Sequence, residues 1–176
     1  MTSKDITVIP EYFKGYVSLI SEDMPVLEAL NHYGPGYLSP LWSDYMSLGN
    51  RVYEDGKWTI REILVHIIDA ERIFAYRALR IARGDRTPLT GFDHDAYVSN
   101  SRANNRSFES VLQELSAVRN ATIALFESFD NDQLNLFGTA SGKEVSVLAL
   151  GFMICGHLVH HTDIINSRYL PLLRPD

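Results

Sequence analysis

The chain has 176 residues, of which 45% are hydrophobic and 22% are charged, and its formal net charge is −6. A chain of this length fits one domain with a sizeable core, so we expect residues 1–176 to form a single unit, and the composition excludes an intrinsically disordered protein. The mildly acidic balance, with no block of basic residues, argues against a nucleic-acid binder.

Two features concern the cellular compartment. Cys155 is the only cysteine, so no disulfide can form within the chain, which suits a reducing cytoplasm. The first residues lack the apolar core of a secretory signal, and we find no apolar run of the roughly 18 to 20 residues that span a bilayer. We therefore expect a cytoplasmic protein with no membrane partner.

The first half of the chain contains two segments with the apolar spacing of amphipathic helices. The first covers about residues 10–30, with Pro10 at a position that suits the first turn of a helix. The second covers about residues 59–83, where Thr59 and Glu62 have the spacing of an N-terminal capping box. Both segments predict long helices with one buried face.

The second half contains two more helical segments. One covers about residues 107–129 and the other about residues 146–170, and each begins at a serine that is suited to cap it, Ser107 or Ser146. The last helix is expected to end before Pro171, because proline cannot continue a helix. No alternating strand pattern competes, so we predict an all-α protein with four main helices.

Three connections join these helices. Residues 31–57 contain several glycines and prolines, and a short helix is expected there over about residues 39–48. Residues 84–106 form a polar connector that is long for a loop, and long loops in compact domains are often functional. Residues 130–145 are expected to hold at most a brief extended pair.

Three of the six histidines lie in one five-residue stretch of the predicted fourth helix, namely His157, His160 and His161. Residues four apart stack on one face of a helix, and the row through His157 and His161 is the apolar one. The row through His160 is small or polar, so we expect this histidine at an edge or at the surface. The inward pair can deliver two imidazoles to one cation, but catalytic zinc sites typically use three protein ligands.

A third imidazole is available on the second helix. His66 lies beside the apolar stripe of that helix, and helical bundles build metal sites from side chains on facing helices. Three neutral imidazoles with an open position suit Zn²⁺ or Ni²⁺, and also Fe²⁺. The alternative is that the histidines only form hydrogen bonds inside the bundle, since an inward histidine is more often a core residue than a ligand.

Other polar residues have two interpretations each. Glu62, four residues before His66, could orient its imidazole, although the capping box is the simpler role. Arg168 shares a face with His161 and could meet an anionic substrate, although a cation also stabilises a helix C-terminus. His94 lies among carboxylates in the polar connector, which could form a weak metal site, although we read it as solvated. Cys155 projects away from the histidine pair, and we expect it to be inert.

The second helix carries many charged residues. Their three- to five-residue spacing predicts a solvated outer face. The residues concerned are Asp69, Glu71, Arg72, Arg77, Arg80 and Arg83.

Two stretches, KWTIREILVHIIDAERIFAYRALRIARGDRTPLTGFD at 57–93 and GHLVHHTDII at 156–165, resemble the DinB-like family. The similarity extends over nearly the whole chain. The resemblance implies an up-down four-helix bundle of the DinB/YfiT-like type with a long connection between helices 1 and 2. It also implies a homodimer and a divalent metal held by His66, His157 and His161.

The sequence departs from many relatives next to the histidine pair. An acidic residue commonly follows the first histidine, where this chain has Leu158, and Arg-Gly-Gln commonly follows the last, where it has Thr162, Asp163 and Ile164. These positions bear on the substrate and on the surroundings of the metal. The family's particular activities are therefore not transferred to this chain.

The resemblance implies a metal-dependent enzyme that acts on a small molecule. The chemistry would be a transfer to or from a low-molecular-weight thiol, or a hydrolysis. The alternative is a non-catalytic, metal-stabilised dimer with a stress-related or partner-binding role. The enzyme requires a pocket that is open at the metal, whereas the structural protein requires a closed coordination sphere.

Overall fold

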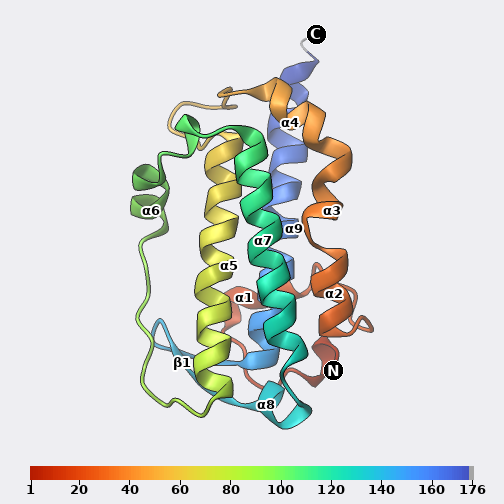
Figure 1. Cartoon of the computed structure of the whole chain (residues 1–176), viewed down its shortest axis with the longest axis vertical. Helices are drawn as coiled ribbons and strands as arrows, with labels where there is room; N and C mark the ends of the chain where they lie inside the picture. The colour runs from red at the N-terminus through yellow and green to blue at the C-terminus, as the bar shows by residue number, and fades with distance from the viewer. Residues whose placement is uncertain (175–176) are drawn as a thin grey trace.

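A computed structural model describes residues 1–174 and shows four helical columns packed side by side, with a small hairpin at one end (Figure 1). The predicted all-α four-helix bundle is confirmed. The first column is broken into consecutive pieces, whereas the other three are continuous. The pieces are α2 (Val26–His32), α3 (Pro35–Leu38) and α4 (Trp42–Leu48), and the continuous columns are α5 (Ile60–Ala82), α7 (Phe108–Glu127) and α9 (Val147–Ile164).

The path of the chain differs from a simple up-down order, because α5 and α7 run in the same direction. The Arg61 guanidinium, at the start of α5, donates a 3.0 Å hydrogen bond to the carbonyl of Arg106, just before α7. The segment between them therefore crosses the length of the bundle, and it carries α6 (His94–Ser101) along the outside of α5 (Figure 1). The long connection thus joins the second and third columns. The connection expected at 31–57 is itself largely helical.

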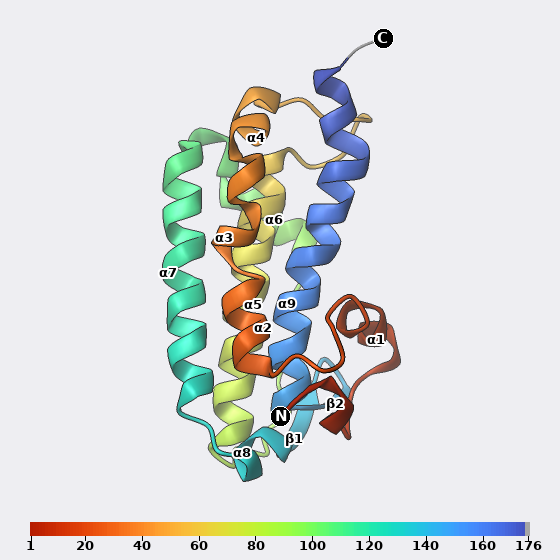
Figure 2. The ribbon, with the colours of Figure 1, turned by 90° about the vertical axis from the view of Figure 1, so that its right-hand side faces the viewer.

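The prediction of one helix over residues 10–30 was wrong. The structure has α1 (Glu11–Val17), a turn, and then α2, with Pro25 at the N-cap of α2. Proline lacks the N–H that a continuing helix needs, and its ring clashes with the carbonyl four residues earlier, so the chain breaks there. As a result α1 lies against α9, outside the four columns (Figure 2).

The predicted helix caps are confirmed. The Thr59 hydroxyl accepts a hydrogen bond from the amide of Glu62, and the Glu62 carboxylate accepts one of 2.7 Å from the amide of Thr59. Ser107 and Ser146 cap α7 and α9 with their hydroxyl oxygens. Each such cap is worth about 1 kcal/mol of stability, so these local signals fix where the three long helices begin.

A short hairpin closes one end of the bundle, as expected within residues 130–145. After α8 (Asn131–Asn135), β1 (Phe137–Ala140) pairs antiparallel with β2 (Lys143–Ser146). The turn between the strands places Ser141 and Gly142 at positive φ, 52° and 73°. Leu89, from the crossover after α5, pairs with Ala140 and so ties that segment to the hairpin.

The last helical stretch is more apolar than we expected. An 18-residue stretch within the segment Val147–Leu173 has a mean hydropathy of 1.3 and is long and apolar enough to cross a membrane by length and composition alone. However, 78% of it is buried by the rest of the protein. A helix that is apolar all round is buried in a core, and α9 is the core helix of this bundle, as in soluble proteins.

The prediction of a solvated charged face on the second helix was wrong at two positions. The side chains of Glu71 and Arg77 are only 2% and 5% exposed. Glu71 forms two hydrogen bonds of 2.8 Å with the guanidinium of Arg119 from α7. Local periodicity treats such charges as solvated, whereas here a partner from a distant helix makes burial tolerable.

Candidate metal centre

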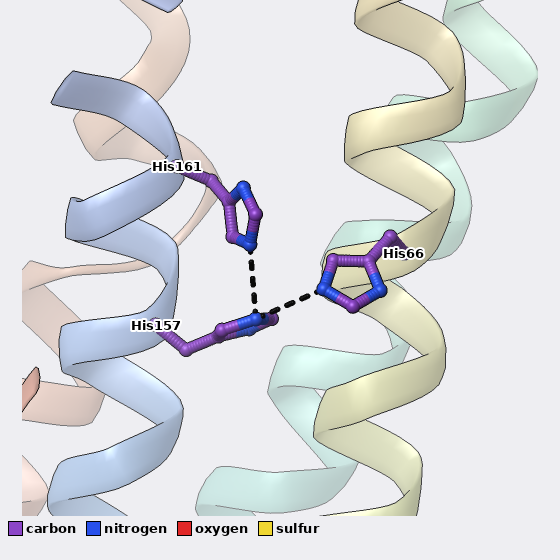
Figure 3. Close-up of side chains that lie close together, drawn as sticks. All are labelled: His66, His157 and His161. Atoms are coloured by element: carbon purple, nitrogen blue, oxygen red, sulfur yellow. Dashed lines mark hydrogen bonds between the residues drawn. The ribbon is translucent and has the colours of Figure 1, made fainter. Parts of the chain in front are cut away.

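Three imidazoles from two helices point at one another (Figure 3). His66 comes from α5, and His157 and His161 come from α9, one helical turn apart. The Nε2 atom of His157 lies 3.1 Å from the Nε2 of His66 and 3.1 Å from the Nε2 of His161. His66 and His157 are buried, and His161 is half-buried. The residues that the sequence selected are thus brought together by the fold.

These distances suit a shared cation. Nitrogens about 2.0–2.1 Å from a zinc ion, at the corners of a tetrahedron, stand about 3.3 Å apart. A neutral imidazole has one N–H donor and one acceptor nitrogen, so three converging Nε2 atoms cannot all satisfy one another. A cation that accepts all three lone pairs would remove this conflict. The donor set therefore fits a divalent metal.

The surroundings of the histidines favour their neutral form. Burial, reinforced by neighbouring histidines, lowers the pKa of His66 to about 4 and that of His161 to about 3. Burial and the same neighbours hold the pKa of His157 well below its ordinary value. At neutral pH the three imidazoles are therefore uncharged, which is the form that binds metals.

A cavity of about 370 Å³ opens beside the three imidazoles. Aromatic side chains form most of its wall, from α1, the start of α5, α5 itself and the crossover segment. These include Phe13, Tyr16, Trp58, Phe74 and Phe92. Within the described part of the chain, no aspartate, glutamate or cysteine lines this cavity. An additional ligand of the cation can therefore enter from the cavity.

Sequence reasoning missed two residues of this site. His94 is exposed, as we expected, but it is the first residue of α6, and its ring centroid lies 5.9 Å from that of His66. Tyr16 of α1 places its ring 5.5 Å from His157 and 5.0 Å from His160. The aspartate before His94, which caps α6, is the one local signal for this placement. No local signal places Tyr16.

The remaining candidates lie elsewhere. The Glu62 carboxylate is bound to the amide of Thr59, in the capping role, and does not line the cavity. Arg168 is exposed in a π-helical turn, Ile165–Tyr169, and does not line the cavity either. Cys155 is fully buried, and burial raises the pKa of its thiol to about 12, so it is inert, as expected. His160 is half-buried at the edge of the cavity, as expected.

The fold and the histidine cluster define a class of proteins, four-helix bundles with a three-histidine pocket. The sequence matches the profile of the DinB superfamily over residues 44–165, and the chain belongs to that superfamily. The matched segment includes all three histidines. The family resemblance seen in the sequence is thereby confirmed.

One solved structure supports the fold. It is reported as "YfiT from Bacillus subtilis is a probable metal-dependent hydrolase with an unusual four-helix bundle topology". It superposes with a TM-score of 0.65 at 16% sequence identity, covering 92% of this chain and 90% of that chain. No curated protein sequence matches this chain. At such low identity, the likeness establishes the bundle topology alone.

Proposed function

We propose that the protein is a divalent-metal-dependent enzyme that uses His66, His157 and His161 as ligands and acts on a small molecule in the adjoining cavity. The observation that carries this proposal is the convergence of three Nε2 atoms at the wall of an open cavity, with that of His157 3.1 Å from each of the other two. Zn²⁺ and Ni²⁺ are the ions that suit three imidazoles best. When bound, such an ion would lower the pKa of a water or thiol that enters its open position and would polarise a substrate carbonyl.

Among the possible reactions, we favour hydrolysis. The cavity of about 370 Å³ is near the lower end of ligand pockets, which span roughly 300–1,000 Å³. It leaves little room for a low-molecular-weight thiol together with a second substrate, whereas a hydrolase needs only water beside its substrate. The description of YfiT as a probable metal-dependent hydrolase agrees with this choice. Transfer to a low-molecular-weight thiol is the second reaction to assay.

The protein's own side chains would orient the ligands and exclude bulk water. The Trp58 ring packs 4.9 Å from the ring of His66, and Phe74 lies edge-on, 6.1 Å from His157. Each of these two aromatic contacts restricts how the imidazole beside it can rotate. The open cavity also favours an enzyme over the non-catalytic alternative, which requires packed side chains above the metal.

We further propose that the enzyme is a cytoplasmic homodimer. Large apolar side chains are exposed on α1, α2 and α4, namely Tyr12, Leu27 and Met46. Such side chains are candidates for a face that a second copy covers. The single free cysteine suits a reducing compartment. Sedimentation at two protein concentrations should give the mass of two chains, and a monomer at both would remove this part of the proposal.

The experiment that tests the site is elemental analysis of protein purified without a histidine tag. We expect about one zinc or nickel per chain in the wild type and in His160→Ala, and almost none in a His157→Ala/His161→Ala double variant. The loaded protein is then assayed with panels of small esters and amides and, separately, with thiol acceptors. Wild-type protein that stays free of metal after equilibration with Zn²⁺ and Ni²⁺ would contradict the proposal.

A further inference from the structure

The cavity beside the histidines contains one permanent charge of its own. Arg77 is the only lysine or arginine among the described residues that line it, and no acidic side chain lines it. A bound divalent cation would add to the charge of Arg77. The cavity is therefore electropositive and suits an anionic ligand.

Arg77 is buried without a counter-charge. Its side chain is 5% exposed, and no carboxylate of the described residues lies within 4.0 Å of it. Its Nη2 donates to the carbonyl of Thr90 at 3.0 Å and to the hydroxyl of Ser141 at 2.9 Å. Across residues 1–174, Nε and Nη1 donate to no other group. These two donors are not cut off from solvent, so a ligand that enters the cavity can supply acceptors in place of water.

Arg77 lies on the same helix as His66, and its guanidinium is directed toward the histidines. Arg77 lies eleven residues after His66 on α5, about 16 Å along the helix axis at 1.5 Å per residue. Helical side chains lean toward the N-terminus, so the guanidinium is directed back toward His66. Phe74 lines the same cavity, with its ring 5.9 Å from the guanidinium and 6.1 Å from the ring of His157.

The fold holds the guanidinium in place from the side opposite α5. Ser141 adopts a left-handed backbone conformation in the hairpin turn, with φ of 52°, and its amide donates 2.9 Å to the carbonyl of Leu89. This bond joins the hairpin to the crossover segment that contains Thr90. Both groups that orient Arg77 are thus fixed before any ligand arrives, and the unused donors of the guanidinium keep their direction.

We propose that the substrate carries a carboxylate that accepts a charge-assisted hydrogen bond from one of the free donors of Arg77, Nε or Nη1. Its apolar body lies along Phe74, and its reacting group reaches His66, His157 and His161. The inference rests on the proposed function, because it names the substrate class of that same cavity. Nη2 is already engaged by Thr90 and Ser141, so the carboxylate pairs with the guanidinium through a single bond, which its charge makes stronger than the bond to a neutral amide.

The experiment uses metal-free protein, so that a carboxylate cannot bind through the cation. Calorimetry compares 3-phenylpropionate with its neutral amide, 3-phenylpropionamide, on the wild type, Arg77→Gln and Arg72→Gln. Arg72 is exposed on the same helix, and its substitution removes the same charge outside the cavity. We expect the wild type and Arg72→Gln to prefer the carboxylate about tenfold or more, and Arg77→Gln to lose that preference.

A merely structural role of Arg77, as a tie between α5 and the hairpin, would lower stability without changing the ratio of the two affinities. If Arg77→Gln does not fold, NMR of the wild type decides instead. The Nε–H or Nη1 resonances of Arg77 should shift with the carboxylate and not with the amide. Equal affinities in the wild type, or unshifted resonances, would overturn the inference. A carboxylate preference in a protein that never binds metal would keep this inference and reject the proposed function.

Discussion

The backbone carbonyl of Tyr16 rests on Gly156, where a Cβ atom would stand only 2.0 Å from its oxygen. This contact presses α1 against α9 one residue before His157. It brings the ring of Tyr16 to 5.5 Å from that of His157 and makes α1 one wall of the cavity. The absence of a side chain at position 156 thus shapes the candidate metal centre.

Gly156→Ala should displace α1 from α9. The obstructing atoms belong to the backbone and cannot rotate away, so we expect the free energy of unfolding to fall by about 1–3 kcal/mol, as for other overpacked sites. Gly15→Ala is the matched control, because a Cβ there would meet nothing within 4 Å and alanine favours a helix. Urea unfolding of both variants is the measurement. A Gly156→Ala protein as stable as the wild type would show that α1 is not held by this contact.

A bound metal should stabilise the folded protein through His161 and not through His160. A ligand that binds only the native state adds about 2.7 kcal/mol when its free concentration is 100 times its Kd. Melting curves with excess Zn²⁺ or Ni²⁺ and with a chelator should therefore separate clearly for the wild type and for His160→Ala. His161→Ala should lose most of that separation. Equal metal-dependent shifts in the two variants would remove His161 from the ligand set.

The three long helices and the histidine set follow from local patterns in the sequence. Thr59, Ser107 and Ser146 cap their helices where their spacing from the apolar stripes requires it. His66 and His157 fall on apolar stripes, and a stripe must face the core, so their meeting needs only that α5 and α9 be neighbours. Helical periodicity carries that much information without knowledge of the complete fold.

Contacts between distant segments could not be predicted in this way. Pro25 breaks the first helix, and where α1 then goes depends on the space at Gly156, far along the chain. Glu71 and Arg77 look solvated because their burial depends on Arg119 and on the hairpin turn at Ser141. Partners of this kind leave no trace in the local spacing of residues, so the sequence predicts the histidine cluster and misses much of the cavity around it.

The metal-free protein should lose stability as the pH falls below about 6.5. The pKa values of His66 and His161 in the folded protein, about 4 and about 3, lie below the ordinary value of 6.5. Between these values the unfolded chain binds more protons than the folded protein. The histidine contribution to the free energy of unfolding is therefore complete above about pH 6.5 and decreases as the pH is lowered through this window. Each group contributes at most about 1.4 kcal/mol per pH unit.

Urea unfolding with a chelator at pH 7, 6 and 5 measures this dependence. Acidic side chains add their own contribution at the lower end, so the informative quantity is the difference between variants. His66→Leu should show a shallower fall than the wild type, because one proton-binding difference has been removed. Parallel curves for the two proteins would show that His66 does not resist protonation in the folded state.

The buried pair of Glu71 and Arg119 should couple three of the four columns. Both side chains are 2% exposed and share two bonds of 2.8 Å, and Arg119 also donates to the carbonyls of Leu30 and Tyr33 at the end of α2. Arg119→Met leaves the Glu71 carboxylate buried alone, which should lower the free energy of unfolding by about 3–5 kcal/mol.

The double variant Glu71→Leu/Arg119→Met separates the ion pair from the hydrogen bonds to α2. Replacing both charges by apolar groups removes the unpaired carboxylate, so the double variant should be more stable than Arg119→Met alone. The carbonyls of Leu30 and Tyr33 lose their donor in both proteins, so the double variant should remain less stable than the wild type. Urea unfolding of the four proteins in the cycle measures both effects. Strictly additive losses would show that Glu71 and Arg119 act independently.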